Sequence, residues 1–451
     1  MLQYLLNMNK ELIRKATIII QTLQNNNHIA YFAGGCVRDM LLKEVPKDID
    51  IATSATPETV LKLFPHCHQI GAAFGIINVV IENESFEVAT FREEDGYTDG
   101  RHPAKINYTT SPKLDAARRD FTINAMFYDP INDKILDYHN GEEDLNNHLL
   151  KAVGKADKRL SEDFLRILRA IRFAIRFDLT INNDVKNAII KNLKGLKKLS
   201  AERIRDELNK IFIGKNPHKA FAILEELGIF KIIIPELSAL KGVEQSAKYH
   251  PEGDVFTHTM LMLEHMTYPN IELAWSILLH DIGKPTTYAL DEDGIPHFYA
   301  HEKFGQEIAE RILFQLKFSK KEIKNISSAV RNHMKFAHVD KMKKAKLKRF
   351  MAEDNFSLQL ELHRIDCISS HSIMNNYIFL LDELITLKNT PSLPPPLLNG
   401  KDIINLGISP GPFIGSLLKK VQDAQLEGII NSKNEAIEMV QSEVSNLNIK
   451  K

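Results

Sequence analysis

Hydrophobic spacing changes near residue 155, and this change leaves few architectures open to the chain. Before it, short β-type runs such as HIAYFAGG, GIINVVI and SFEVATF alternate with turn signals. After it, nearly every segment has the spacing of an amphipathic helix. The pattern predicts an α+β protein in which a mixed-sheet head, entered by a helix within residues 1–25, precedes several helical domains.

The length of 451 residues allows about two to four packed units. Four prolines in NTPSLPPPLLNG, residues 389–400, end any helix and indicate a boundary. We expect a head over 1–150, a helical segment over 151–215, a larger helical region over 216–390 and a helical tail over 391–451.

Charge and cysteine content narrow the class of protein. Lys plus Arg and Asp plus Glu number 58 each, so polyanion binding would need a local basic surface. The three cysteines show no CxxC spacing, which argues against a disulfide framework and a thiolate zinc site. There is no secretory signal pattern and no apolar run of membrane-spanning length, so we expect a cytoplasmic protein without a membrane segment.

The stretch AGGCVRDMLLKEVPKDIDIAT predicts a site for a nucleotide and its metals. In a strand over DIDIAT, Asp48 and Asp50 project from one face and offer oxygen ligands to Mg²⁺. Gly34 and Gly35 let the backbone approach a triphosphate, and Arg38 supplies charge-assisted bonds to it. The competing interpretation is an ordinary turn followed by a polar strand edge.

The segment ARRDFTINAMFYD places polar groups beside an apolar run. Arg118 and Arg119 are either surface charges or ligands for the nucleotide. Asp120 and Asn124 provide the acceptor and donor groups needed to hold a ribose.

The segment RLSEDFLRILRAIRFAIRF predicts one amphipathic helix capped by Ser161. Its polar band begins at Asp163, and Glu162 can pair with Arg166 four residues later. The arginines of this band follow at intervals of three or four residues: Arg166, Arg169, Arg172 and Arg176. The competing interpretation is a helix with solvated arginines.

A fixed carboxylate beside a fixed guanidinium would select a base by its edge. Asp163 would accept from the amino group of cytosine or adenine, while Arg166 would donate to the neighbouring acceptor. Guanine and uracil present the reverse order and would leave buried groups unpaired, at a cost of about 1–3 kcal/mol each. The segment therefore predicts a protein template for CTP and ATP.

These motifs resemble those of the class II tRNA nucleotidyltransferases, the CCA-adding enzymes and their bacterial poly(A) polymerase relatives. GGCVRDMLL, DIDIAT, RRDFTINA, SEDFLRILRAIRFA and SAERIRDEL match in order and spacing across about residues 28–215. The resemblance implies a palm-like head, a helical neck over 151–215, and a body and tail that hold tRNA. It implies Mg²⁺ at Asp48 and Asp50, and bracing of the site by Glu202, Arg203 and Glu207. It also implies sugar contacts and a base template from these residues: Arg118, Arg119, Asp120, Glu162, Asp163 and Arg166.

Two stretches bear on the subdivisions of this family. EEDGYTDGRHPAKI resembles the flexible loop of full CCA-adding and A-adding enzymes, with Asp99, Gly100 and Arg101 in its DGR motif, although His102 replaces the usual second arginine. IGAAFGIINVV lacks the Arg-Arg pair typical of poly(A) polymerases, which disfavours poly(A) synthesis. Addition of CCA and addition of the terminal A alone both remain open.

A second constellation lies between about residues 250 and 375. It resembles the HD phosphohydrolase superfamily, which implies a bundle of helices that binds a divalent metal, Mg²⁺, Mn²⁺, Ni²⁺ or Co²⁺, and hydrolyses phosphoesters. Lys284, in HDIGKP, is expected to contact phosphate. The expected ligands are His258, His280, Asp281, His301, His333 and Asp366.

Three other classes compete with a tRNA nucleotidyltransferase. A protein-modifying nucleotidyltransferase joined to an HD domain would show a different glycine motif and added regulatory domains. A non-enzymatic RNA-binding protein would not need Asp48 and Asp50. A protein whose main task is HD hydrolysis would not need an intact head. The sequence does not indicate the oligomeric state.

Overall fold

The computed structural model describes residues 10–69, 75–97, 103–386 and 393–448. The chain forms two compact units. The first comprises Met1–Ser238 with Gln315–Lys317, and the second comprises Ala239–Phe314 with Phe318–Lys451. Within the described ranges, every helix is too short or too polar to span a bilayer.

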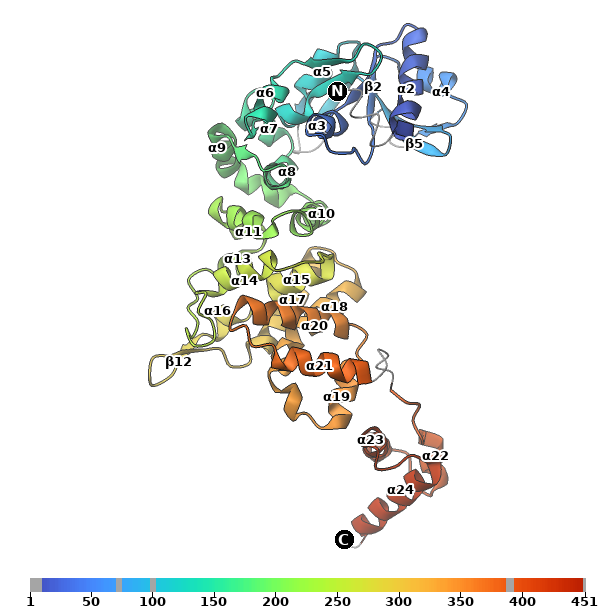
Figure 1. Ribbon diagram of the computed structural model, residues 1–451, viewed down its shortest axis with the longest axis vertical. Coiled ribbons are helices and arrows are strands. Elements are labelled where there is room, and N and C mark those ends of the chain that lie inside the picture. Colours follow the sequence, from blue (N-terminus) through green and yellow to red (C-terminus); the bar gives the residue numbers. More distant parts are fainter. Residues whose placement is uncertain (1–9, 70–74, 98–102, 387–392, 449–451) are drawn as a thin grey trace. The chain divides into compact units, whose positions relative to one another are not determined.

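The first unit is built on a seven-stranded mixed sheet (Figure 1). β2 and β5 run parallel, and the other neighbouring strands run antiparallel. The predicted β-type runs all contribute strands, and β3 is an edge strand that was not predicted. In sheet order the strands are β3 (Cys67–Gln69), β4 (Ile76–Ile81), β5 (Glu84–Thr90), β2 (Ile51–Thr53), β1 (Ala30–Ala33), β8 (Met126–Asp129) and β9 (Lys134–Asp137).

Helices cover the sheet and continue into the neck. The predicted first helix is α2, whose buried Ile19, Ile20 and Leu23 join the core formed with the sheet. The helices of this unit are α2 (Lys10–Asn25), α3 (Gly35–Leu41), α4 (Pro57–Leu63), α5 (Pro112–Ala117), α6 (Gly141–Asn146), α7 (Ala156–Glu162), α8 (Leu165–Arg176), α9 (Asn183–Asn192), α10 (Ala201–Phe212), α11 (Pro217–Glu226), α12 (Phe230–Ile233) and α13 (Pro235–Ser238).

The polar stretch over 93–106 was expected to be a loop, but most of it lies in an antiparallel hairpin. Its strands are β6 (Arg92–Tyr97) and β7 (Pro103–Tyr108). Asp99, Gly100 and Arg101 lie outside the described residues. A smaller parallel pair joins β10 (Leu149–Leu150) to β11 (Thr180–Ile181).

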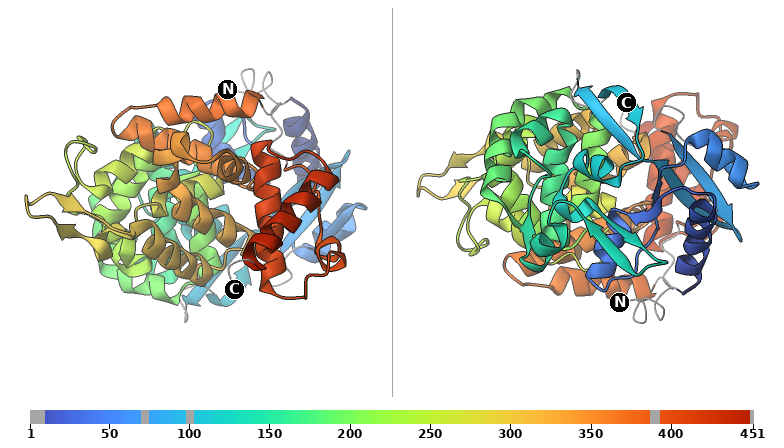
Figure 2. Two further views of the ribbon diagram at one scale, coloured as in Figure 1. Left: turned by 90° about the horizontal axis from the view of Figure 1, so that it is seen from below. Right: turned by 90° about the horizontal axis from the view of Figure 1, so that it is seen from above.

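The second unit is helical, as predicted, and carries one short hairpin of β12 (Ala289–Leu290) and β13 (Pro296–His297). Helices α14, α15, α18 and α20 pack together and appear in yellow to orange in Figure 2. Trp275 of α15 is fully buried. The helices are α14 (Val255–Glu264), α15 (Ile271–Leu279), α16 (Lys284–Thr287), α17 (His301–Gln315), α18 (Lys320–Asn332), α19 (Lys344–Met351), α20 (Phe356–Ser369), α21 (Asn375–Thr386), α22 (Gly400–Asn405), α23 (Pro412–Glu427) and α24 (Lys433–Asn448).

Candidate functional site

Asp48 and Asp50 lie just before β2 and line the same pocket. The strand begins at Ile51, later than predicted, but the alternation expected from a strand persists: Ile49 is buried and the two aspartates are exposed. Among the described residues, no hydrogen-bond donor contacts either carboxylate, so their oxygens are available to a cation. Desolvation by surrounding atoms, reinforced by the charges of Asp48 and Glu87, raises the pKa of Asp50 to about 6.

Glu87 is a third carboxylate that the sequence analysis missed. The parallel register of β2 and β5 pairs Ile51 with Val88, so Asp50 and Glu87 precede paired residues on neighbouring strands. Parallel partners project toward the same face of a sheet. The exposed Glu in the alternating run SFEVATF was the available signal.

Gly34 and Arg38 shape the wall beside the aspartates. Gly34 has φ +72°, and a Cβ on it would lie 2.7 Å from Arg119 Nη1. Arg38, expected to bind phosphate, is buried and donates to Asp39 and to Asn124, and its guanidinium carbon lies 4.0 Å from the centroid of the Phe177 ring. Arg38 therefore holds the wall of the pocket in place.

Buried acids orient the arginines of the RRDFTINA segment. Asp115, which the sequence analysis did not single out, is 1% exposed and pairs with Arg118 at 2.8 Å and with Arg119 at 3.1 Å. Asp120 accepts from Arg169 at 2.6 Å and from Asn124 at 3.1 Å. Burial alone would raise the pKa of Asp120, but the Arg169 charge and these hydrogen bonds hold it well below its usual range.

The single helix predicted over this part of the neck is wrong. α7 ends at Glu162, Asp163 is extended, and α8 begins at Leu165. Ser161 caps neither helix, because its hydroxyl donates to the carbonyl of Lys158 inside α7. Asp163 instead accepts from the backbone N–H of Leu165 at 3.0 Å, which stabilises the start of α8.

The predicted pairing of Glu162 with Arg166 is confirmed at 2.8 Å. Arg166 also donates to the carbonyls of Arg159 and Arg118, so its guanidinium is held in one plane. From α10, Arg203 donates to Asp163 at 2.9 Å.

One cavity of about 600 Å³ brings these groups together. Arg172, held by Glu207 at 2.7 Å, also lines it, whereas Glu162 lies behind Arg166 and Glu202 is exposed on α10. The cavity has cations for phosphates, carboxylates for metal and a fixed carboxylate–guanidinium pair. Of the predicted bracing residues, Arg203 lines the cavity. The residues predicted to bind nucleotide or metal that line it are Gly34, Gly35, Arg38, Asp48, Asp50, Arg118, Arg119, Asp120, Asn124, Asp163, Arg166 and Arg169.

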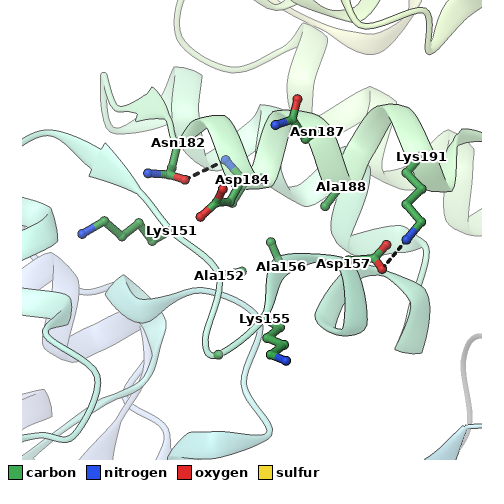
Figure 3. Close-up of a pocket in the computed structure, with 12 residues that line it drawn as sticks. Lys151, Ala152, Lys155, Ala156, Asp157, Asn182, Asp184, Asn187, Ala188 and Lys191 are labelled. Atoms are coloured by element: carbon green, nitrogen blue, oxygen red, sulfur yellow. Dashed lines mark hydrogen bonds and ion pairs between the residues drawn. The ribbon is translucent and has the colours of Figure 1, made fainter.

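A different pocket, of about 490 Å³, lies between α7 and α9 and contains none of the predicted site residues (Figure 3). Its charged groups are partly satisfied by one another: Lys191 pairs with Asp157 at 2.7 Å. Asn182 Oδ1 accepts from the backbone N–H of Asp184. We assign no chemistry to it.

In the second unit, the six predicted HD residues form one cluster, in which Asp366 is partly exposed and the other five are buried. Donor atoms of His258, His280 and Asp366 lie within 4.8 Å of one another, and so do those of Asp281, His301 and His333. His280 Nε2 is 3.0 Å from Asp281 Oδ2, which joins the two groups.

All four histidines of this cluster are oriented in the same way. The Nδ1 atoms of His280, His301 and His333 contact the backbone carbonyls of the residues three positions earlier. His258 Nδ1 contacts the Glu252 carboxylate instead. Each Nε2 therefore faces the cluster. His258 Nε2 and His280 Nε2 are buried and lie 3.1 Å from Asp366 Oδ1 and 3.0 Å from Asp281 Oδ2, but neither contact has the geometry of a hydrogen bond. This donor set fits divalent transition metals.

Electrostatics in the cluster differ between rings. Burial lowers the pKa of His333 to about 3, so this ring is neutral. Burial acts the same way on His258, but the carboxylates of Asp366 and Glu252 outweigh it and raise its pKa to about 9. Lys284, expected to contact phosphate, is buried and pairs with Asp281 at 2.7 Å.

Two glycines permit the close packing of this cluster. A Cβ on Gly283 would lie 2.2 Å from the carbonyl oxygen of His301 and 2.7 Å from the backbone nitrogen of Gly305. The turn after Asp281 therefore rests directly on the start of α17 and brings His301 to Asp281.

Comparison with known families agrees with this arrangement. A model described as "Poly A polymerase head domain" matches residues 30–151. A model described as "Probable RNA and SrmB- binding site of polymerase A" matches 178–241, and the HD domain matches 254–358.

Curated relatives and solved structures give the family. The chain is 31% identical over 427 residues to a CCA-adding enzyme of Lactobacillus johnsonii, which covers 95% of this chain and 96% of that protein. It is 28% identical over 445 residues to one of Staphylococcus aureus, covering 97% and 100%. The fold resembles the Bacillus stearothermophilus CCA-adding enzyme solved with CTP, with TM-score 0.73, 23% identity and coverage of 97% and 99%. The chain belongs to the family of CCA-adding tRNA nucleotidyltransferases and carries an HD domain.

Proposed function

We propose that the cavity of the first unit adds C, C and A in turn to the 3′ end of tRNA from CTP and ATP, without a nucleic-acid template. One observation supports this proposal above the others. Asp48 and Asp50 of the head line the same cavity as Asp163 and Arg166 of the neck. Solved relatives in complex with CTP, with ATP and with tRNA support the same substrates.

The chain's own residues divide the work. Arg118 and Arg119, held by Asp115, bind the nucleotide, while Asp163 and Arg166 pair with the base edge. The tRNA 3′-hydroxyl attacks the α-phosphate and pyrophosphate leaves. Mg²⁺ bound by Asp48 and Asp50 would lower the pKa of that hydroxyl and neutralise part of the charge of the triphosphate.

The test offers purified protein three tRNAs, ending at the discriminator base, at C or at CC, with labelled CTP and ATP separately. We expect addition of C to the first two and of A to the third. Addition of A alone would identify an A-adding enzyme. The D48A/D50A variant should add neither.

We further propose that a lysine-rich groove of the second unit binds RNA phosphates. A cavity of about 590 Å³ lies between α19 and α23, and Lys343, Lys346 and Lys419 of its lining have no charged partner among the described residues. Phosphate contacts of this kind dominate RNA affinity and weaken as salt rises.

The HD cluster supports a second activity, hydrolysis of terminal phosphates or 2′,3′-cyclic phosphates on RNA ends. This proposal is supported by the four histidines of the cluster, whose Nε2 atoms all face its interior as metal ligands would. A divalent ion there, Mg²⁺, Mn²⁺, Ni²⁺ or Co²⁺, supplies a hydroxide nucleophile near neutral pH. The test measures phosphate release and ring opening with each ion in the D48A/D50A background. Loss of activity in D281N assigns it to this cluster, and no activity with any ion overturns the proposal.

A further inference from the structure

Glu252 is a buried carboxylate directly behind the HD cluster. Its side chain is 6% exposed, and Oε1 lies 2.6 Å from Nδ1 of His258, which is fully buried. The same oxygen lies 2.9 Å from Nδ1 of His250. Glu252 is not among the six HD ligands, and no part of the proposed chemistry uses it.

The contact fixes the orientation of His258. A ring whose Nδ1–H donates to a carboxylate directs its Nε2 to the opposite side, and here Nε2 lies 3.1 Å from Asp366 Oδ1. Metal binding at Nε2 would displace any proton that this atom carries. A carboxylate behind a metal-binding histidine orients the ring and makes it a stronger ligand.

His258 differs in this respect from the other three histidines. Backbone carbonyls hold His280, His301 and His333, and no side-chain substitution removes those contacts. Only His258 depends on a side chain, so its orientation can be altered without changing a ligand.

We propose that Glu252 is a positioning residue for the HD metal site, which holds His258 so that Nε2 binds a divalent ion. The inference rests on the proposed HD function. His250, Glu252 and His258 also have donor atoms within 4.8 Å, so Glu252 as a direct ligand is the outcome to be distinguished. Both histidine Nδ1 atoms contact the same oxygen, which favours hydrogen bonding over coordination.

The experiment titrates Co²⁺ into the metal-free full-length protein by calorimetry and follows the Co²⁺ absorption bands. The D48A/D50A background removes metal binding by the head. E252A should weaken Co²⁺ binding about 10- to 100-fold and change the absorption bands. E252Q should weaken it less, because an amide oxygen still accepts from Nδ1. E302Q is the matched control: Glu302 follows a predicted ligand but pairs with Arg331, at 2.7 Å. The E302Q variant should bind Co²⁺ as tightly as the D48A/D50A background protein does.

The outcomes separate this inference from the function on which it rests. No Co²⁺ binding by the background protein would overturn the HD proposal and this inference with it. Normal binding by E252A would overturn only the inference. Loss of one full metal equivalent in both E252A and E252Q would make Glu252 a ligand. Urea unfolding without metal, followed by Trp275 fluorescence, checks that the E252A fold is intact; if it is not, E252Q decides.

Discussion

Glu162 and Arg166 form an ion pair of 2.8 Å in which each side chain is only about one-tenth exposed. Arg159 binds the same carboxylate oxygen at 2.8 Å. A guanidinium held in this way presents its remaining donors in one direction, which is the requirement for selecting a base by its edge.

E162Q removes the charge that fixes Arg166. We expect kcat/KM for both CTP and ATP to fall about 10- to 100-fold, equivalent to about 1.4–2.7 kcal/mol, and discrimination against GTP to fall as well. Single-nucleotide addition with each triphosphate measures both effects. E226Q, at an exposed position on α11, is the control. A variant that keeps full discrimination would show that Arg166 is held without the charge of Glu162, by the carbonyls of Arg159 and Arg118.

The lysine groove should govern the salt dependence of tRNA binding. The K343A/K346A/K419A variant should bind tRNA more weakly, and the slope of log K against log salt should become shallower by about one for each phosphate that the variant no longer neutralises. Filter binding over a range of salt concentrations measures the slope. The control removes three lysines of α18, K320A/K321A/K324A. Equal slopes in the two triple variants would argue against the groove.

Gly283 should tolerate no side chain. In G283A, the new Cβ collides with backbone atoms of His301 and Gly305, which cannot rotate away as a side chain can. The start of α17 must therefore move away from the turn that follows Asp281. We expect lower stability of the second unit and weaker binding of Co²⁺ in the D48A/D50A background. The G415A control changes a glycine of α23 with no atom within 4 Å of the added carbon. Alanine there should be neutral or stabilising by up to about 1 kcal/mol.

Sequence reasoning succeeded where a local pattern determines the geometry. Alternation placed Asp48 and Asp50 on one side, and the four-residue interval paired Glu162 with Arg166. It failed where a contact between residues far apart in the sequence determines the local structure. Where the helix breaks at Asp163, this residue accepts a hydrogen bond from Arg203 of α10, forty positions later in the sequence. The periodicity of the segment reports only on neighbours three or four residues apart and could not predict this contact.

The same reason explains the other misses. β6 and β7 are polar strands that pair mainly with each other, so the hydrophobic alternation that reveals a strand is weak. Glu87 lies in an alternating β-type run and Glu252 in a polar turn, and neither local pattern says which distant residue each will face. Strand register brings Glu87 beside Asp50, and the loop before α14 brings Glu252 under His258.

The buried His363 should make the second unit less stable in acid. Burial lowers the pKa of His363 to about 4, against 6.5 for an ordinary histidine, and its ring stacks on Phe336 at 4.6 Å. Between pH 4 and 6.5 the unfolded chain binds the proton more tightly than the folded one. Stability therefore rises with pH in this window and is lost as the pH falls. Lowering the pH from 7.5 to 5.0 should cost about 2 kcal/mol through this group.

H363F keeps a stacking ring and removes the titration. Trp275 is the only tryptophan and lies in the second unit, so urea unfolding followed by its fluorescence reports on the unit that contains His363. Wild-type protein should lose about 2 kcal/mol more than H363F between pH 7.5 and 5.0. An equal loss in both proteins would mean that His363 is not what destabilises this unit in acid, since every other titrating group is unchanged between them.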